Sequence, residues 1–405
     1  MSLQVKINFL IYSKLKGVKM SKNSFGKEYK LKEIGTIITG NTPSKKVPEY
    51  YGGNLPWIKP ADLDKSKYLI SSDEYISDLG KEKVRLVPKG SVLVSCIGNI
   101  GKVAISGCEL CTNQQINTIV PNTNIVSPEF LYYLILWSKS HLQQISTAAV
   151  VPLINKKDFS NFRVIIPSIE IQRGIVEKLE NVEKLINYRN ESIKLMDYYL
   201  ESIFSEYFGN IISNSKNWDM GLLEDIAIFK TKSMNPDDFD ENWYYVGLEN
   251  IESQKGSFSN LSLVADNEIK SSKYYFNQDV VLYGKLRPYL NKVALPDFEG
   301  ICSTDIIPIS PKKNSNKHFI RFLLSHEYYV NLSTQRSTGA NLPRVSPSKL
   351  KKFEVPIPPI ELQNQFAEIV QQVEEIKKYQ QESKLELENL FNNLMQKAFK
   401  GELVC

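Results

Sequence analysis

The sequence predicts two mixed α/β (α+β) domains in tandem repeat, alternating with two long α-helices that form an antiparallel coiled coil with pseudo-two-fold symmetry. Two observations predict this fold class. The first is a long-period repeat, because Pro167–Gln172 returns 191 positions later as Pro358–Gln363 and Cys111-Thr112 returns as Cys302-Ser303. The second is a heptad pattern of apolar residues after each Pro-to-Gln segment. A long-period repeat decides the architecture, because each copy folds as a similar unit.

Length and composition indicate an ordinary soluble globular protein. The chain has 405 residues, of which 42% are hydrophobic and 23% charged, enough for two or three domains with their own cores. No apolar run approaches the ~18–20 residues of a membrane span. Five cysteines, an odd number, suggest a reduced protein, so we expect a cytoplasmic location. Residues 1–25 contain five lysines and no acidic residue, and we expect them to form a flexible N-terminal extension.

The net charge of +5 is unevenly distributed along the chain. Residues 26–167 carry 17 Lys and Arg against 12 Asp and Glu, whereas residues 168–208 carry 5 against 8. The second copy repeats this contrast, with 18 against 17 in residues 209–358 and 5 against 8 in residues 359–405. Neutral-to-basic domains that alternate with acidic segments are compatible with nucleic-acid binding through local patches.

The two acidic segments are predicted to be helices that pair with each other. Each starts next to proline, where helices commonly begin. Because residues 209–358 join the end of the first helix to the start of the second, and the termini of a domain usually lie close together, we expect the helices to be antiparallel. The predicted contact positions are Ile175, Leu179, Val182, Ile186, Arg189, Ile193, Met196, Leu200, Ile203 and Tyr207 in the first helix, and Phe366, Val370, Val373, Ile376, Leu387, Leu390, Phe391 and Leu394 in the second.

The intervening domains combine short strands and helices. Helices are predicted at Pro128–Gln144 and Lys317–Leu332. Strands are predicted at Ser91–Ile97, Lys102–Ile105, Ile116–Val120, Phe162–Ile166, Val280–Tyr283, Lys292–Leu295 and Ile306–Ile309. The predicted organisation is an extension at 1–25, a first domain at 26–167, a first helix at 168–208, a second domain at 209–358 and a second helix at 359–405.

A local signature lies near the start of the first domain. Gly40–Ser44 (GNTPS) is followed by Tyr50–Ile58 (YYGGNLPWI) and then by Asp62-Leu63. At this point the chain resembles the specificity subunit of type I restriction-modification systems. That family carries two target-recognition domains that alternate with helical regions, and often a G-x-T-P…Y-x-G-G-x-x-P-W pattern. The resemblance covers residues from about Lys27 to Lys400.

Two features depart from the family pattern. The second domain lacks G-x-T-P and has Lys230-Thr231-Lys232 and Tyr244–Gly247 instead, so we expect the two domains to prefer different DNA sequences. The helices start with Glu-Ile-Gln and Glu-Leu-Gln, where many relatives have Glu and Gln adjacent.

Sequence readout needs hydrogen-bonding groups at base edges and Lys or Arg at phosphates. Several Gly-punctuated or amide-rich turns supply them, although turn chemistry alone also explains such residues. The candidate DNA-binding residues are Asn41, Thr42, Lys45, Lys46, Asn99, Lys102, Asn113 and Gln114 in the first domain, and Lys230, Lys232, Lys285, Arg287, Tyr289, Asn291, Asn341 and Arg344 in the second.

Catalytic and metal motifs are missing from the sequence. We find no N-P-P-Y or D-P-P-Y tetrapeptide, no glycine-rich motif for S-adenosylmethionine and no P-loop. A nuclease pattern would need Pro236-Asp237 and Glu268–Lys270, which lie far apart, and Cys108 and Cys111 form a lone pair without further zinc ligands. Three histidines leave little for acid–base chemistry. We therefore expect no catalytic residue and no metal site in this chain.

The sequence favours a DNA sequence-recognition subunit that reads a bipartite target, one half-site per domain, with the helices fixing the gap. The resemblance implies double-stranded DNA, two methyltransferase (M) subunits and two restriction/translocase (R) subunits as partners, with no membrane. S-adenosylmethionine, ATP and Mg²⁺ would then be bound by those partners and none by this chain. The alternatives are the recognition subunit of a methylation-only or type IIB-like system, and a coiled-coil scaffold without DNA specificity.

Overall fold

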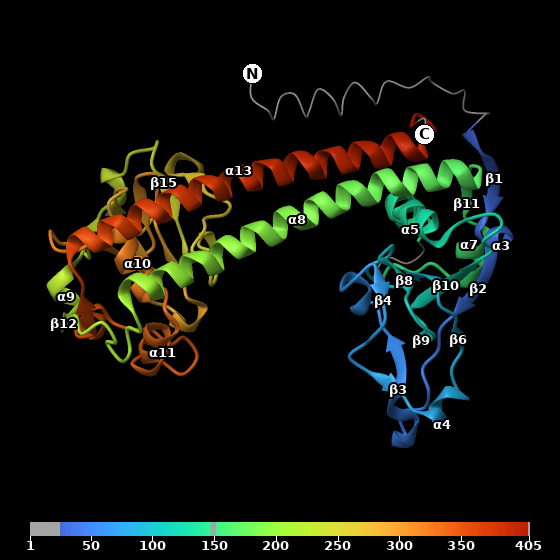
Figure 1. Cartoon of the computed structure of the whole chain (residues 1–405), viewed down its shortest axis with the longest axis horizontal. Coiled ribbons are helices and arrows are strands. Elements are labelled where there is room, and N and C mark those ends of the chain that lie inside the picture. The colour runs from blue at the N-terminus through green and yellow to red at the C-terminus, as the bar shows by residue number, and fades with distance from the viewer. Residues whose placement is uncertain (1–24, 147–150, 404–405) are drawn as a thin grey trace. The chain divides into compact units, whose positions relative to one another are not determined.

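The computed structural model describes residues 25–146 and 151–403. These residues form two compact units, one built from the chain up to Arg189 together with the chain from Ser383 onward, the other from Asn190–Glu382 (Figure 1). Each unit thus combines one α/β domain with part of both long helices. The predicted extension, residues 1–25, lies outside the described residues except for Phe25, which is buried.

The first unit contains two larger sheets and a short strand pair. One sheet has the order β2 (Gly35–Thr39), β10 (Ile116–Pro121), β7 (Val92–Ser95), β8 (Val103–Ser106) and β4 (Tyr68–Leu69). The other has the order β5 (Tyr75–Ile76), β3 (Tyr51–Ile58), β9 (Leu110–Thr112) and β6 (Leu86–Val87), and β1 (Lys27–Lys30) pairs with β11 (Arg163–Ile166). The helices are α3 (Leu31–Ile34), α4 (Asp78–Lys81), α5 (Pro128–Trp137), α6 (Lys139–Gln144) and α7 (Lys156–Asn161), with 3₁₀ turns at Pro48–Tyr50 and Asp62–Asp64.

The second unit repeats this plan. One sheet has the order β13 (Ala227–Phe229), β21 (Ile306–Pro311), β18 (Val281–Gly284) and β19 (Val293–Ala294). The other has the order β14 (Ser233–Met234), β17 (Lys273–Phe276), β20 (Gly300–Cys302), β15 (Tyr244–Val246) and β16 (Ser262–Leu263), and β12 (Asp219–Leu222) pairs with β22 (Glu354–Ile357). The helices are α9 (Leu223–Ile226), α10 (Lys317–Ser325), α11 (Glu327–Gln335) and α12 (Pro347–Lys351), with 3₁₀ turns at Pro236–Asp238, Leu248–Asn250, Val264–Asp266 and Pro288–Leu290.

The central strands bury both faces, because successive side chains of a strand point to opposite sides of the sheet. In β7, Val92 and Val94 belong to the core that includes α5, whereas Leu93 belongs to a second core on the other face. In β18, Val281 and Leu282 divide in the same way. This explains why the predicted strands read as nearly continuous apolar runs.

Two predicted helices are interrupted. The predicted helix Pro128–Gln144 is broken at Ser138, between α5 and α6. The predicted helix at Lys317–Leu332 is broken at His326, whose backbone is extended and whose Nδ1 accepts a hydrogen bond from the Tyr328 N–H at 3.2 Å. His326 therefore caps the start of α11, a local competition with the helix that the apolar spacing did not reveal.

Both predicted long helices are present, α8 at Ile169–Phe208 and α13 at Ile360–Phe399, each 40 residues long. The predicted end of the second helix at 405 is wrong, because α13 ends at Phe399 and residues 400–403 are not helical. One predicted contact position is wrong, because Ile376 is 46% exposed. The side chain of Lys377 is instead only 15% exposed and pairs with Asp197 of α8 at 2.8 Å. The heptad steps of three and four from Val373 reach both 376 and 377, so the sequence alone does not choose between them.

Each unit packs the start of one long helix and the end of the other against its own domain. In the first unit, Ile175 and Phe399 share a core with Phe130 of α5, and the Arg189 Nε donates to the Ser383 Oγ at 3.2 Å. In the second unit, the rings of Phe208 and Phe366 lie 5.3 Å apart. Within residues 25–146 and 151–403, no helix combines the length and apolar character that crossing a bilayer requires.

Candidate nucleic-acid interface

The candidate residues lie mainly on loops at matched ends of two equivalent sheets. In the first unit, β2 and β7 end where β8 and β10 begin, because these neighbouring strands are antiparallel. Residues 40–46, 96–102 and 113–115 therefore emerge at one end of the sheet. In the second unit, β13, β18, β19 and β21 have the same senses, so residues 230–232, 285–292 and 303–305 emerge at the equivalent end.

Hydrogen bonds hold the loops 40–46 and 113–115 together in the first unit. The Gly40 N–H donates to the Ile116 carbonyl at 3.1 Å and the Asn41 N–H to the Thr112 carbonyl at 2.9 Å. A Cβ on Gly40 would lie 2.2 Å from the carbonyl oxygens of Thr112 and Asn113, so only glycine allows this approach. The Thr42 hydroxyl then donates to the Gln114 side-chain oxygen at 2.5 Å. The structure thus brings Thr42 and Gln114, 72 residues apart, into one polar pair.

The amides of Asn41 and Asn113 are already engaged inside the domain. The Asn41 side chain donates to the Lys83 carbonyl at 2.7 Å and accepts from the Arg85 N–H at 2.9 Å. Asn113 is 6% exposed, donates to the Gln115 side chain and accepts from the Gln115 N–H. Both therefore position the loops, a role that residue type and spacing did not distinguish from base reading.

The remaining candidates of the first unit reach solvent to different degrees. Lys45, Lys46, Asn99 and Gln114 are exposed. Lys102, in contrast, is ion-paired with Asp64 and its side chain is only 17% exposed. The loops thus present amides and two exposed lysines, whereas the charge of Lys102 is partly neutralised.

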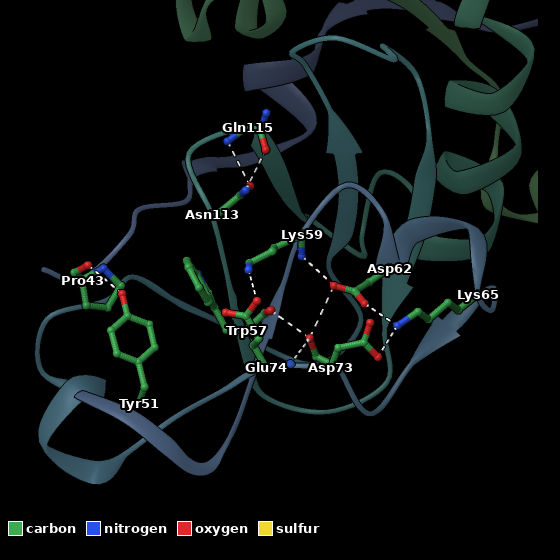
Figure 2. Close-up of polar contacts among 11 residues, drawn as sticks. Pro43, Tyr51, Trp57, Lys59, Asp62, Lys65, Asp73, Glu74, Asn113 and Gln115 are labelled. Carbon is green, nitrogen blue, oxygen red and sulfur yellow. Dashed lines mark hydrogen bonds and ion pairs between the residues drawn. The ribbon is translucent and has the colours of Figure 1, made fainter. Parts of the chain in front are cut away.

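A polar cluster around Trp57 and Asp62 of the sequence signature lies beside these loops, and its members Lys59, Lys65 and Glu74 were not singled out by the motif search (Figure 2). The Lys59 ammonium sits 4.6 Å from the centre of the Trp57 ring and is ion-paired with Glu74. Asp62, which is 3% exposed, accepts hydrogen bonds from the Lys59 N–H at 2.9 Å and from the Lys65 ammonium at 2.7 Å. The Tyr-Tyr-Gly-Gly…Trp segment and Asp62 of the sequence signature therefore fold into one scaffold for the Gly40–Lys46 loop, whose Pro43 carbonyl accepts from the Tyr51 hydroxyl at 2.7 Å.

In the second unit, an ion pair joins two candidate loops. The Arg344 guanidinium bonds both carboxylate oxygens of Asp305, Nε to Oδ1 at 3.0 Å and Nη2 to Oδ2 at 3.3 Å, and these hydrogen bonds raise the pKa of Arg344. The backbone of Arg344 also pairs with that of Leu286 in an isolated antiparallel β-bridge. The loops 285–292, 303–305 and 339–344 therefore form one surface.

The other candidates of the second unit divide between held and free side chains. The Asn291 amide donates to the Ser325 carbonyl at 3.0 Å and to the Gln254 side chain at 3.2 Å, so it is a loop-holding group. Lys230 and Lys285 are half-buried. The exposed members are Lys232, Arg287, Tyr289 and Asn341.

The repeated glutamine at each helix start ties the domain to its helix. Gln172 is fully buried, donates to the Pro167 carbonyl at 2.9 Å and the Ile125 carbonyl at 2.8 Å, and accepts from the Ser127 N–H at 2.9 Å. Gln363 makes the same three contacts with Pro358, Asn314 and Asn316. The sequence repeat contained both glutamines but did not indicate this contact, because each glutamine binds a loop that lies more than forty residues away in the sequence.

Two groups with strongly shifted pKa values, Cys111 and His318, are buried in the domain interiors. Burial raises the pKa of the Cys111 thiol to about 12 and, with the nearby Lys317 and Arg321, lowers the pKa of His318 to about 4. Cys108 and Cys111 donate to different backbone carbonyls. In the described part of the chain, no group of three or more His, Cys, Asp or Glu side chains is placed to hold a metal ion.

Two repeated α/β units, each with a polar loop surface at the same end of the same sheet, define a duplicated recognition protein. Residues 25–195 and 215–389 each match the family described as "Type I restriction modification DNA specificity domain". The chain therefore belongs to this family and carries its domain twice.

Named relatives and solved structures agree with this assignment. The chain is 26% identical to the "Type I restriction enzyme MjaIX specificity subunit" of Methanocaldococcus jannaschii over 92% of both chains. It is 25% identical to the "Type I restriction enzyme EcoDI specificity subunit" of Escherichia coli over 71% of this chain and 73% of the relative. Its fold resembles that of the type I restriction-modification S subunit from M. genitalium, with a TM-score of 0.56 and 15% identity. The match covers 94% of this chain and 98% of that subunit. A chain from a solved structure of the type I R-M system gives a TM-score of 0.58 with 17% identity. That match covers 96% of this chain and 100% of the other chain.

Proposed function

We propose that this chain is the DNA sequence-specificity subunit of a type I restriction-modification complex, and that each of its two domains reads one half of a bipartite double-stranded target. The observation that carries the proposal is the matched placement of two polar loop surfaces within a family defined by DNA specificity. The surfaces share a framework but not their side chains. Different half-sites follow from that difference, because base edges are distinguished by the donors and acceptors offered to them.

The test is a DNA-binding measurement on the chain assembled with its methyltransferase partner, across a library of duplexes and several salt concentrations. We expect a two-part preferred sequence and an affinity whose logarithm falls linearly with the logarithm of salt concentration, because bound phosphates release counterions. Exchanging residues 26–167 for another recognition domain should change one half of the preferred sequence and leave the other intact. Binding without sequence preference would rule the proposal out.

The two long helices are proposed to pair antiparallel and to set the gap between the half-sites. Contacts inside each unit support this pairing. In the second unit Asp197 is ion-paired with Lys377, and the ring of Phe208 packs against that of Phe366. Residue numbers therefore increase along α8 in the direction in which they decrease along α13, as in an antiparallel pair. A pseudo-two-fold relation is supported by the ring pair Phe130–Phe399 at 5.4 Å and its counterpart Phe319–Phe208 at 4.9 Å.

A length change in the helices tests the spacing role. Removing one heptad from both helices shortens them by about 10 Å. The preferred gap should shrink while both half-site sequences stay the same, which sequencing of the methylated host genome would reveal. A change in the half-site sequences themselves would contradict the division of labour between domains and helices.

The chemistry is proposed to belong to partner subunits. Two methyltransferase subunits, one per half-site, would bind S-adenosylmethionine, and two restriction/translocase subunits would bind ATP and Mg²⁺, while this chain is non-catalytic. The family assignment supports such partners. The complex would act in the cytoplasm, where the host DNA is accessible. Copurification with tagged methyltransferase, followed by native mass measurement, gives the stoichiometry.

A further inference from the structure

The loop between the two central strands is anchored in the same way in both units, although it runs over residues 96–102 in the first and over the longer segment 285–292 in the second. In the first unit, the Gly98 N–H donates to the Pro152 carbonyl at 2.9 Å, and Gly98 and Gly101 have positive φ values of 73° and 85°. In the second unit, the Arg287 N–H donates to the Pro343 carbonyl at 2.7 Å.

Each loop also contains two left-handed residues, at positions 98 and 101 in the first unit and at positions 287 and 291 in the second, but their residue types differ. Arg287 and Asn291 have φ values of 50° and 47°, where the first unit has two glycines. Asparagine tolerates this conformation, and its side chain is tied to the Ser325 carbonyl. Arginine has no such adaptation, because its Cβ crowds the backbone there.

A second constraint acts on the same residue. The residue before a proline is pushed toward extended conformations, and Pro288, which is buried, follows Arg287 directly. The contact with Pro343 and the hydrogen bond from the Leu290 N–H to the Arg287 carbonyl at 2.9 Å hold the backbone in place from both sides. A strained conformation that the surroundings maintain is a mark of functional positions.

The side chain of Arg287 is available to contact a ligand. Arg287 is exposed, and no hydrogen bond or ion pair of its guanidinium occurs within residues 25–146 and 151–403. Its neighbour Arg344, in contrast, is committed to Asp305. At the equivalent Gly98, a Cβ would meet no atom within 4 Å, so this position of the frame faces open space.

Resting on the proposed function, we propose that Arg287 is a specificity-determining residue that reads a guanine edge in the half-site bound by the second domain. The fixed backbone sets the direction of the Cα–Cβ bond, and the planar guanidinium fork matches the O6 and N7 acceptors of guanine in the major groove. A phosphate contact needs only a flexible charge and would not require a strained residue.

Two variants of the full chain, assembled with the methyltransferase partner, test the assignment. Arg287→Gly relieves the backbone strain, so its thermal midpoint should be unchanged or higher. Arg287→Lys keeps the charge and loses the fork. Both variants should lose discrimination at one position of one half-site, by roughly 10- to 100-fold against the wrong base, while the other half-site is read as before. Lys270→Gln, which removes an exposed charge in the same unit, is the control and should change nothing.

The outcomes separate the possibilities. Unchanged base preference in Arg287→Lys, with a uniform affinity loss and a salt slope lower by about one in Arg287→Gly, would mean a phosphate contact and would overturn the proposal. A lower thermal midpoint of Arg287→Gly with losses at both half-sites would mean a folding role and would also overturn it. A wild-type complex without any sequence preference would refute the proposed function itself.

Discussion

The two recognition units differ in their loops and agree in how each is attached to its helix. Gln172 and Gln363 make the same three hydrogen bonds, whereas the loop frame shared by Gly98 and Arg287 carries different side chains. Attachment must be the same in both units because each joins equivalent helix starts. The loops carry no such shared constraint, so their side chains are free to diverge. The two units therefore share the joint to the helix and differ in the loop surface.

The largest effect is expected where the helix ends enter the domain cores. Phe208 is fully buried and its ring lies near those of Phe204, Phe319 and Phe366, whereas its counterpart Phe399 is 6% exposed. Phe208→Ala should lower the free energy of unfolding by about 3–5 kcal/mol, because it leaves a large cavity. Phe399→Ala should cost less. Denaturant unfolding of the full chain measures both, and equal losses would contradict the difference in packing.

Smaller effects of similar size are expected at the two glutamines. Gln172→Met and Gln363→Met each leave a partly buried backbone N–H without its acceptor, which costs about 1–3 kcal/mol. The loss for Gln363→Met should be equal or larger, because the Gln363 side-chain oxygen also accepts a hydrogen bond from the buried Ser315 hydroxyl at 3.3 Å. A clearly larger loss for Gln172→Met would contradict the similarity of the two joints. Leu185→Met, on an exposed position of α8, is the control.

The third effect depends on pH, is smallest near neutral pH and belongs to the second unit alone. His318 is 8% exposed, and neither of its ring nitrogens has a hydrogen-bond partner among residues 25–146 and 151–403. Its position in the first unit is occupied by Glu129. Its pKa is lowered to about 4, so below pH ~6.5 the unfolded chain binds a proton that the folded chain does not. Stability should therefore fall as pH drops from 6.5 toward 4, by up to about 1.4 kcal/mol per pH unit.

His318→Leu separates this contribution from other acid effects. The variant should lose that part of the pH dependence and unfold at a similar denaturant midpoint at pH 7.5, measured by the same denaturant titration. An unchanged slope between pH 6.5 and 5 would show that the imidazole is not held neutral.

Much of the fold follows from local periodicity. Both 40-residue helices and the central strands lie within a few residues of their predicted bounds, because apolar spacing reports which face is buried. The breaks at Ser138 and His326 were not predicted, because a cap or a turn within an apolar pattern leaves the spacing intact. Periodicity also failed to decide between two neighbouring positions of one helical turn, because Ile376 is exposed and Lys377 is largely buried.

By itself, the sequence determined the duplication, the order of domains and helices and the loops that carry polar side chains, since these depend on spacing along the chain. Only the tertiary structure decided which of those side chains are available. Asn113 is turned inward and Arg344 is bound to Asp305, while Arg287 is held in a left-handed conformation by Pro343. Each of these outcomes depends on a hydrogen bond or on packing between distant segments, and such contacts leave no periodic trace in the sequence.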